Sequence, residues 1–348
     1  MVITSSGFKA LLSTLIFGAG AIGQWLGALL LSSGEEVTLF GRSHVAKAVE
    51  QQGGLILNDR APLEVEFACS LESLKDQCFE NLVSTVKACS VDAALADIKT
   101  SGVKFRNLMS FQNGWGTDDS YVRDFPDTPV WALTATRAIM MEKPGLLYPS
   151  NKGGLAVAPW QITSKDKCPM AFRRLALPVV SINRGKDLKW SKLILNMIGN
   201  ATGAITGLSP QRLAENPELM RTELQLVKEA LAVGNAMGVE RVDLPGFSVR
   251  FFSRALERLP LPIVAPAIAK KMKSARGEKL PSLFYDLEDP TRATELDALN
   301  GEIASQGEEL GVATPKNRAL TSLFHRCRQD PELWLAIRDK PHILMDYV

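Results

Sequence analysis

The chain contains few of the residues that build disulfide frameworks and metal centres. Its 348 residues include only three histidines and five cysteines, and no two cysteines form a C-x-x-C pair. The histidines also lack the spacing of metal ligands. These shortages argue against a disulfide-stapled fold and against a zinc site, and they fit a reducing cytoplasm. The cysteines are Cys69, Cys78, Cys89, Cys168 and Cys327.

The sequence also lacks an excess of charge of either sign. Forty basic side chains stand against 38 acidic ones, for a net charge of +2. A balance this close gives no electrostatic reason to expect nucleic acid or an anionic membrane as partner, so a small molecule is expected. The basic cluster AKKMKSARGEK, within residues 240–281, is interpreted as a solvated helix end plus a loop, with a membrane or partner site as the weaker alternative.

Long hydrophobic runs are missing as well. The most apolar late stretch, LPLPIVAPAIA at 259–269, is too short to span a bilayer and is interrupted by Pro260, Pro262 and Pro266. The first twenty residues have no clear cleavage site after a long apolar core, and their apolar run soon reaches a glycine turn. We therefore predict no transmembrane segment and a cytoplasmic protein.

The first half of the chain alternates apolar runs with amphipathic segments, and the second half is helical in pattern. A strand, helix, strand repeat predicts parallel pairing and a doubly wound sheet. We expect a Rossmann-type α/β domain over residues 1–185 and an all-helical domain over 186–348, with the boundary near Gly185. The expected strands are 13–17, 36–40, 82–86, 107–110, 130–136, 155–158 and 179–182, and the expected helices are 22–33, 43–52, 91–100, 190–206, 217–237, 247–258, 292–310 and 316–327.

Three glycines lie between the first expected strand and the first expected helix. In LIFGAGAIGQW, Gly18 permits a tight turn, Gly20 lets backbone approach a pyrophosphate, and Gly23 allows the helix to pack closely on the strand. The helix N-terminus offers free N–H groups to the phosphates. Glycine clusters also mark ordinary turns, but the strand and helix context favours dinucleotide binding.

The end of the second expected strand indicates which dinucleotide is bound. Proteins that prefer NAD usually place an acidic residue there to bind the ribose hydroxyls, whereas this chain has Gly41 and Arg42. A guanidinium suits a 2′-phosphate, so NADP(H) is predicted. The absent carboxylate also disfavours S-adenosylmethionine, and a solvated loop arginine is the plain alternative.

Two later strand ends add polar groups at the carboxyl edge of the expected sheet, where doubly wound folds bind ligands. NLVSTVKA ends at Lys87, and NLMSFQNGWG contains Gln112, Asn113 and Gly114. An Asn-Gly pair is usually only a turn. Its place at this edge leaves two interpretations of Asn113 open, a functional role and a plain turn.

A polar stripe runs along an otherwise apolar helical segment, LKWSKLILNMIGNATGAIT at 188–206. Lys192, Asn196 and Asn200 stand four residues apart and so fall on nearly one helix face. Buried polar groups need partners, so something polar is expected to face the stripe. From periodicity alone, asparagines that cross-link helices and a lysine that reaches solvent explain the pattern equally well.

Taken together, these motifs resemble the ketopantoate reductase family, the NADPH-dependent 2-dehydropantoate 2-reductases, over nearly the whole chain. The matching segments are GAGAIG, VSTVKA, SFQNG, KPG, WSKLILNMIGN, PSLFYDL, TELDALNG and GVATPKN. The resemblance implies a sheet domain that binds NADPH and a helical domain, with substrate in the cleft between them.

The resemblance also implies a role for each matching residue. Lys192 is expected to protonate the substrate carbonyl and Glu295 to lie near it, while Asn196, Asn200, Asn113 and Ser282 are expected to bind substrate. The expected cofactor-binding residues are Gly18, Ala19, Gly20, Ala21, Ile22, Gly23, Arg42, Lys87, Asn113, Ala138 and Glu295, and no metal is expected.

Two features depart from the family pattern. Pro210 stands where biosynthetic members often have another substrate asparagine, and the chain is longer than usual within 240–281. Both leave the exact 2-oxo acid open. The prediction is reduction of 2-dehydropantoate to (R)-pantoate; the alternatives are a related reductase of another 2-oxo or 3-hydroxy acid, and a non-catalytic NADPH-binding regulator. The oligomeric state is also open, a homodimer being one option.

Overall fold

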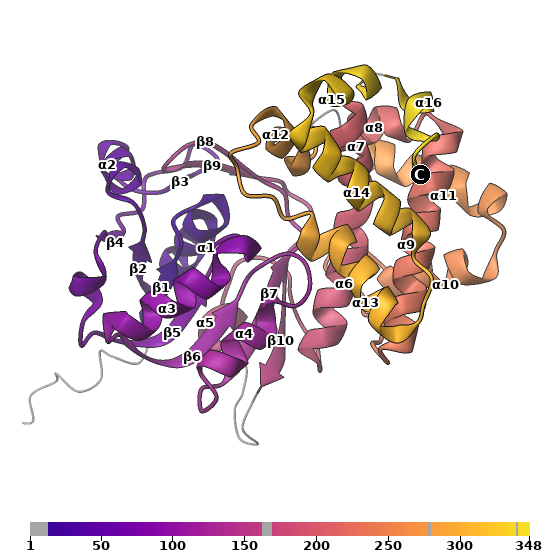
Figure 1. Ribbon diagram of the computed structural model, residues 1–348. Coiled ribbons are helices and arrows are strands. Elements are labelled where there is room, and N and C mark those ends of the chain that lie inside the picture. Colours follow the sequence, from indigo (N-terminus) through magenta and orange to yellow (C-terminus); the bar gives the residue numbers. More distant parts are fainter. Residues whose placement is uncertain (1–12, 162–168, 277–279, 339) are drawn as a thin grey trace, which may run out of the picture. The chain divides into compact units, whose positions relative to one another are not determined.

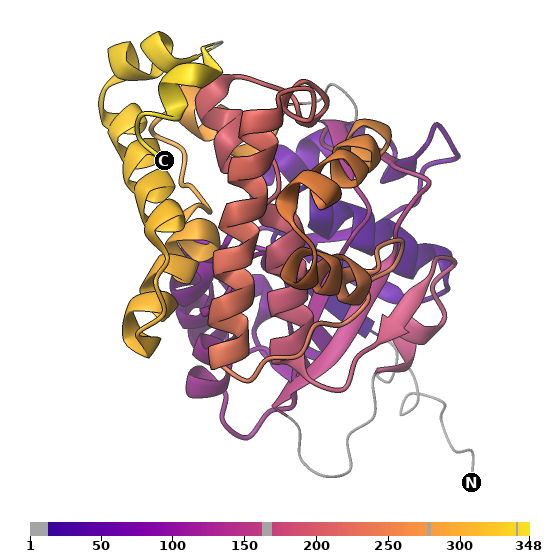
Figure 2. The same cartoon turned by 90° about the vertical axis from the view of Figure 1, so that its right-hand side faces the viewer.

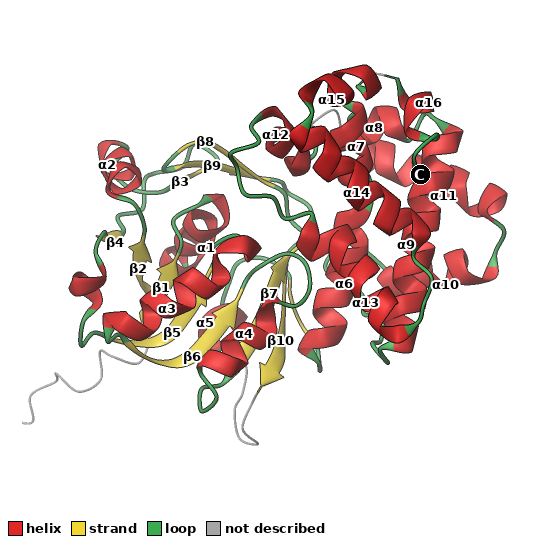
Figure 3. Ribbon diagram, viewed as in Figure 1, coloured by secondary structure: helices red, strands yellow, loops and turns green. Residues whose placement is uncertain are grey.

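The computed structural model describes residues 13–161, 169–276, 280–338 and 340–348. The chain divides into two compact units, each of which takes in a short piece from the other half of the sequence. We call Met1–Gln112, Thr117–Leu188 and Leu244–Phe247 the sheet unit, and Asn113–Gly116, Lys189–Asp243 and Ser248–Val348 the helical unit. All strands of the described chain belong to the sheet unit (Figure 3).

The main sheet of the sheet unit has eight strands in the order β11-β10-β7-β6-β5-β1-β2-β4. β1 pairs in parallel with both β2 and β5, so the strand order reverses at β1. This reversal is where doubly wound sheets bind ligands. The strands are β1 (Ser13–Phe17), β2 (Glu36–Phe40), β4 (Glu66–Ala68), β5 (Cys78–Ser84), β6 (Lys104–Ser110), β7 (Val130–Ala135), β10 (Leu155–Gln161) and β11 (Val179–Ser181).

One strand contradicts the expectation of parallel pairing throughout. β10 runs antiparallel to β7, with Leu155 opposite Ala135. A hairpin precedes it, formed by β8 (Ile139–Lys143) and β9 (Leu146–Pro149), which joins β3 (Ile56–Leu57) in a separate three-stranded sheet. Because β8 and β9 reverse the chain direction without a crossover helix, β10 returns to the main sheet in the opposite sense.

Helices cover both faces of the main sheet, as Figure 1 shows for the elements of the sheet unit. Successive strand residues alternate between the faces: Leu15 and Phe17 belong to one apolar core, and Ile16 belongs to the other. The helices of this unit are α1 (Ala21–Ser32), α2 (Ser43–Gln51), α3 (Val91–Ser101), α4 (Thr117–Asp124), α5 (Met170–Arg173) and the single turns η3 (Leu71–Leu74) and η4 (Ala88–Ser90).

The helical unit is organised around α9 (Pro217–Ala236), which packs against α10, α11, α13 and α14 (Figure 2). Its first turn is capped by Asn216, whose Oδ1 accepts from the amides of Glu218 and Leu219. The remaining helices are α6 (Gly185–Met197), whose residues from Lys189 onward belong to this unit, α7 (Ala201–Thr206), α8 (Pro210–Leu213), α10 (Val249–Arg258), α11 (Leu261–Arg276), α12 (Ser282–Glu288), the π-helical turn η5 (Asp297–Gly301), α13 (Glu302–Leu310), α14 (Pro315–Gln329), α15 (Pro331–Ile337) and α16 (Pro341–Leu344).

Several helix predictions need correction. The single helix expected over 190–206 is two helices, because the chain breaks at Gly199, whose φ is +68°. The helix expected over 292–310 begins only at Asp297, with a π-helical turn. The helix expected over 247–258 is α10, whereas α11, which continues through Pro266, was not predicted. The basic cluster begins in the last turns of α11, at a helix end as interpreted. Part of the basic cluster, residues 277–279, lies outside the described residues. No helix in the described chain has the length and apolarity needed to cross a membrane.

Candidate functional site

The glycine turn after β1 allows no larger side chain at two of its three glycines. Gly18 has a φ of +120°, a conformation that favours glycine, and its amide donates to the carbonyl of Phe40 at 3.0 Å. A Cβ built on Gly23 would lie 2.0 Å from the carbonyl oxygen of Gly18. Glycine is therefore required at position 18 by conformation and at position 23 by packing, as the motif predicts.

Nothing in the described part of the chain requires glycine at position 20. A Cβ built there would meet no other heavy atom of the described chain within 4 Å, apart from its own backbone neighbours. Gly20 is also the N-cap of α1, and no described side chain caps this helix. Free N–H groups at an open helix N-terminus suit an anion, so the turn fits the pyrophosphate of a dinucleotide.

Two side chains that the sequence analysis passed over hold the turn in place. Thr85 Oγ1 donates to the carbonyl of Gly18 at 2.6 Å. Gln24, buried in α1, donates from Nε2 to the carbonyl of Ala19 at 2.8 Å and accepts at Oε1 from the amide of Gly145 at 2.7 Å. The available signal was Gln24 itself, a polar residue among the apolar ones of AIGQWLGALLL.

The end of β2 brings Arg42 close to the glycine turn. A Cβ on Gly41 would lie 2.5 Å from the Cβ of Ala19, so Gly41 allows this close approach of the chain. Arg42 follows directly as the exposed N-cap of α2. An exposed guanidinium is the kind of group that could pair with a phosphate on an adenosine ribose, and this role of Arg42 stays a prediction.

The other residues predicted in the sheet unit differ in what they offer. Lys87 is exposed at the N-cap of η4. Both backbone groups of Ala138 are hydrogen-bonded to Ser150. The Ala138 amide donates to Ser150 Oγ at 3.2 Å, and the Ala138 carbonyl accepts from the Ser150 amide at 2.8 Å. The predicted backbone contact from Ala138 to the cofactor gains no support from this pairing.

Gln112 is a structural residue at the carboxyl edge of the sheet. Its Nε2 donates to the carbonyls of Ser84 at 2.9 Å and Val86 at 3.1 Å, and its Oε1 accepts from the hydroxyl of Tyr121 at 2.9 Å. Burial raises the pKa of Tyr121 above its usual range. These bonds tie the end of β5 to the end of β6, after which the chain enters the helical unit at Asn113.

In the helical unit, the polar stripe is where the spacing predicts it. From Ser191 to Asn200, every residue is buried except Lys192, Asn196 and Asn200, which are partly exposed. The stripe is interrupted, however, because α6 ends at Met197 and Asn200 is the N-cap of α7. The Oδ1 atom of Asn200 is buried and has no hydrogen-bond partner among the residues that the structure describes.

The segment Asn113–Gly116 supplies the polar group expected opposite the stripe. Asn196 Nδ2 donates to Asn113 Oδ1 at 3.0 Å. The segment is fixed by Trp115, whose amide donates to the carbonyl of Ala298 at 3.0 Å and whose ring meets that of Trp190 edge-on, with centroids 5.0 Å apart. The Asn-Gly pair is therefore part of an ordered contact within the helical unit and not an isolated turn.

Glu295 and Ser282 lie in two further segments of the helical unit. Ser282 is the exposed first residue of α12, and Glu295 is partly buried two residues before η5. The roles assigned to these two residues, and to Lys192, stay predictions.

A buried amide network anchors the π-helical turn that follows Glu295. Asn300 Nδ2 donates to Asn317 Oδ1 at 2.9 Å, and Asn317 Nδ2 donates to Glu229 Oε2 at 2.7 Å. Both asparagines belong to segments that carry the family resemblance, TELDALNG and GVATPKN, yet the sequence analysis gave them no role. Short π-helical segments are frequent at functional sites. Here the segment contains Ala298, whose carbonyl accepts the hydrogen bond from the Trp115 amide.

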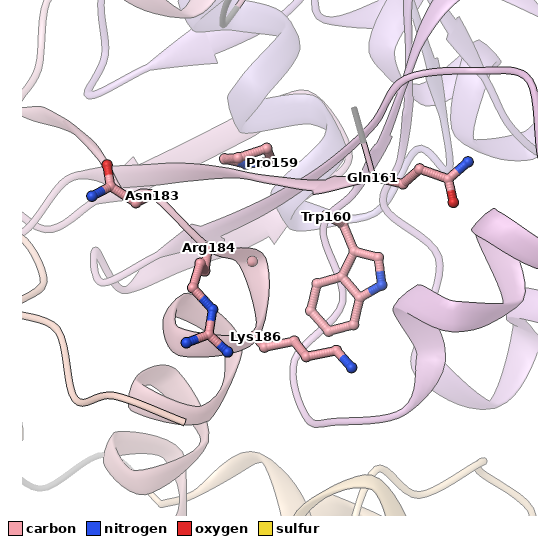
Figure 4. A pocket seen from close by; sticks show the side chains of 7 residues that line it. Pro159, Trp160, Gln161, Asn183, Arg184 and Lys186 are labelled. Atoms are coloured by element: carbon pink, nitrogen blue, oxygen red, sulfur yellow. The ribbon is translucent and has the colours of Figure 1, made fainter. Parts of the chain in front are cut away.

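Two cavities of the described chain are lined by none of the predicted site residues. A cavity of about 450 Å³ in the sheet unit is shown in Figure 4. Several of its polar groups are already engaged: Trp160 Nε1 donates to Asp119 at 3.0 Å, and Arg184 pairs with Asp187 at 3.6 Å. A cavity of about 500 Å³ in the helical unit is lined by residues of η5, α13 and α14. Its lining includes Glu302, a carboxyl whose pKa is raised by burial.

Within the described ranges, no group of three or more acidic, histidine or cysteine side chains could hold a metal ion.

Comparison with known proteins identifies the family. The family model described as "Ketopantoate reductase PanE/ApbA" matches residues 14–161, and "Ketopantoate reductase PanE/ApbA C terminal" matches residues 186–328. The chain belongs to the ketopantoate reductase family. It is therefore an oxidoreductase.

Relatives cover almost the whole chain at low identity. The 2-dehydropantoate 2-reductase of Pyrococcus abyssi is 25% identical over an alignment of 321 residues that covers 89% of this chain and 95% of the relative. That of Streptococcus pyogenes serotype M18 is 24% identical, with 89% of this chain and 96% of the relative covered.

Solved structures share the fold. The PanE/ApbA family ketopantoate reductase from Ralstonia eutropha JMP134 has a TM-score of 0.74 and 26% identity, covering 92% of this chain and 99% of the other. The complex of D-mandelate dehydrogenase with NADH and anilino(oxo)acetate has the same TM-score of 0.74 at 20% identity, with 92% and 99% covered.

Proposed function

We propose that this protein reduces a 2-oxo acid to the 2-hydroxy acid with NADPH, and that 2-dehydropantoate is the first substrate to test. The observation that carries the proposal is the pair of sites described above: an open glycine turn in the sheet unit and the Lys192 stripe in the helical unit of a ketopantoate reductase family member. The curated relatives named above act as 2-dehydropantoate 2-reductases.

The reaction needs a hydride at C2, a proton at the carbonyl oxygen and side chains that bind the substrate carboxylate. NADPH, when bound, would supply the hydride. Its pyrophosphate would lie at the N-terminus of α1, and its 2′-phosphate against Arg42. Lys192 would donate the proton to the carbonyl oxygen, so that one 2-oxo acid, one NADPH and one proton yield the 2-hydroxy acid and NADP⁺.

Neutral side chains would orient the acid. Asn196 and Asn200 carry amide donors, and Ser282 carries a hydroxyl; none of them adds a competing acid. Asn113 already accepts a hydrogen bond from Asn196, so the two amides act as a unit. Glu295 would stabilise the protonated form of Lys192 between turnovers.

The choice of acid has a second candidate, a more apolar 2-oxo acid. Pro210 is buried and packs against the break in the stripe, with its Cβ 3.7 Å from where a Cβ on Gly199 would lie. A proline offers no side-chain hydrogen bond where family members often carry an asparagine. A substrate hydroxyl would lose one partner there, whereas an apolar substituent would lose nothing.

The test is oxidation of NADPH, followed by absorbance, with 2-dehydropantoate and a panel of 2-oxo acids with apolar side chains. The highest kcat/KM on 2-dehydropantoate supports the first candidate, and the highest on an apolar acid supports the second. Binding of NADPH without turnover of any acid would contradict both and leave a non-catalytic regulator. The same panel with NADH tests the cofactor preference.

Two further expectations belong to the proposal. The four described cysteines Cys69, Cys78, Cys89 and Cys327 are free thiols, in keeping with a reducing cytoplasm as the site of action.

A homodimer is the proposed assembly, and light scattering coupled to size-exclusion chromatography measures the oligomeric state directly.

A further inference from the structure

The polar stripe depends on one backbone break. α6 ends at Met197, Gly199 takes a φ of +68°, and α7 begins at Ala201. Asn196 lies before the break and Asn200 lies after it, so the angle between the two helices sets how these amides are directed. A residue that fixes the backbone at Gly199 therefore fixes the relative placement of both asparagines.

A buried carboxylate holds that backbone. Glu223 Oε2 accepts from the amide of Gly199 at 2.7 Å. Glu223 comes from the middle of α9 and is 1% exposed, among apolar neighbours such as Leu219 and Leu226. A buried carboxylate is costly to keep, and a buried backbone amide needs an acceptor. The contact gives the Gly199 amide its acceptor and one oxygen of the carboxylate a donor, at the point where the helix is broken.

Apolar groups also pack against the break. A Cβ built on Gly199 would lie 3.4 Å from Met272 Cε and 3.7 Å from Pro210 Cβ. Both side chains are buried. They confine the break by shape alone, whereas the bond to Glu223 has a direction, because an N–H···O contact weakens steeply off axis.

We propose that Glu223 is a positioning residue for the acid substrate: by accepting from Gly199, it sets the break that directs Asn196 and Asn200. It acts through these asparagines and does not itself contact substrate or cofactor. The inference rests on the proposed function of Asn196 and Asn200 as substrate-binding residues.

Three variants test it with matched geometry. Glu223→Leu keeps the bulk and removes the acceptor, Glu223→Gln keeps an oxygen at the same reach, and Thr222→Val is the control. Thr222 is the adjacent buried polar residue of α9, and its hydroxyl contacts Met345 Sδ at 3.5 Å and not the Gly199 amide. Should Glu223→Leu not fold, Glu223→Asp serves in its place, because a side chain shorter by one methylene withdraws the acceptor.

We expect the loss of the Glu223 carboxylate to change KM for the 2-oxo acid but not KM for NADPH. Glu223→Leu should raise KM for the 2-oxo acid by about tenfold or more, with KM for NADPH unchanged. Glu223→Gln should return KM for the acid to within about threefold of wild type, and Thr222→Val should leave both KM values unchanged. An unchanged KM for the acid in Glu223→Leu would overturn the inference. An equal rise in Thr222→Val, or no rescue by glutamine in a folded protein, would also overturn it.

A readout without turnover separates this inference from the proposed function. If the wild type reduces no acid, the proposed function fails, and the side-chain amide signals of Asn196 and Asn200 in ¹⁵N-labelled protein then test the positioning. These signals should move in Glu223→Leu and hold in Thr222→Val. Signals unmoved in Glu223→Leu would show that the carboxylate does not set the break.

Discussion

The glycine turn of the sheet unit and the polar stripe of the helical unit are built over very different distances along the chain. The turn takes its shape within Gly18–Gly23, from one positive φ and one close approach of backbone, and Thr85, 67 residues beyond Gly18, adds a single hydrogen bond to it. The stripe depends on Asn113, 83 residues before Asn196, and on Glu223, 24 residues after Gly199. A local motif carries its geometry in its own sequence, whereas a distributed one shows only its spacing.

Replacing Lys192 by alanine should separate the two regions most strongly. Loss of a positioned general acid costs roughly 10²- to 10⁴-fold in kcat. The dissociation constant of NADPH, measured by fluorescence titration, should stay at the wild-type value. An equal loss of kcat and NADPH affinity would make Lys192 a structural residue. It would also contradict the assignment of cofactor binding to the glycine turn and of proton donation to the polar stripe.

Two glycines of the turn give a contrast inside the first region. In Gly23→Ala, the new methyl meets the Gly18 carbonyl, so the variant should lose about 1–3 kcal/mol of stability and bind NADPH weakly. In Gly20→Ala, the methyl enters open space, so thermal unfolding should be unchanged while NADPH affinity falls. Normal NADPH binding by Gly20→Ala would show that no phosphate approaches that position.

Arg42 tests the cofactor preference within the same region. A charge-assisted hydrogen bond contributes about 1.5–3 kcal/mol, so Arg42→Ala should lower kcat/KM for NADPH by roughly 10- to 150-fold. The value for NADH should hardly change, because NADH has no 2′-phosphate. A matched loss for both cofactors would assign Arg42 to the fold and not to the phosphate.

The smallest expected effect is on KM for the acid, and it is tested by comparing alanine variants of two glycines with nearly the same φ. Gly199 and Gly238 have φ of +68° and +66°. Alanine at either position should cost about 1–2 kcal/mol of stability because of left-handed strain. Only Gly199→Ala should also raise KM for the acid, since only Gly199 lies at the break between Asn196 and Asn200. A rise in both variants would trace the effect to general destabilisation.

Much of the sheet unit could be predicted, because its signals are local. The strands β1 and β2 have the predicted bounds Ser13–Phe17 and Glu36–Phe40, and five other strands of the main sheet differ from the prediction by a few residues at their ends, while the short edge strand β4 was not predicted. Apolar runs between turn signals define such strands well. The antiparallel β10 was missed because strand direction is decided by the β8–β9 hairpin and not by the composition of β10 itself.

The helical unit was less predictable at the points that matter for function. The break at Gly199 was missed because glycine inside a helical pattern is tolerated, and the carboxylate that holds the break comes from another helix. Helix α11 was missed because prolines mask its pattern; Pro262 lies in the first turn, where no amide partner is lost, and the helix continues through Pro266. Tertiary packing decided both cases.

The most direct test follows the hydride itself. With NADPH deuterated at the transferring position and the preferred 2-oxo acid, the product should carry deuterium at C2, and the Lys192→Ala variant should form the same labelled product far more slowly. Product without deuterium at C2, or no product while NADPH remains bound, would contradict the account.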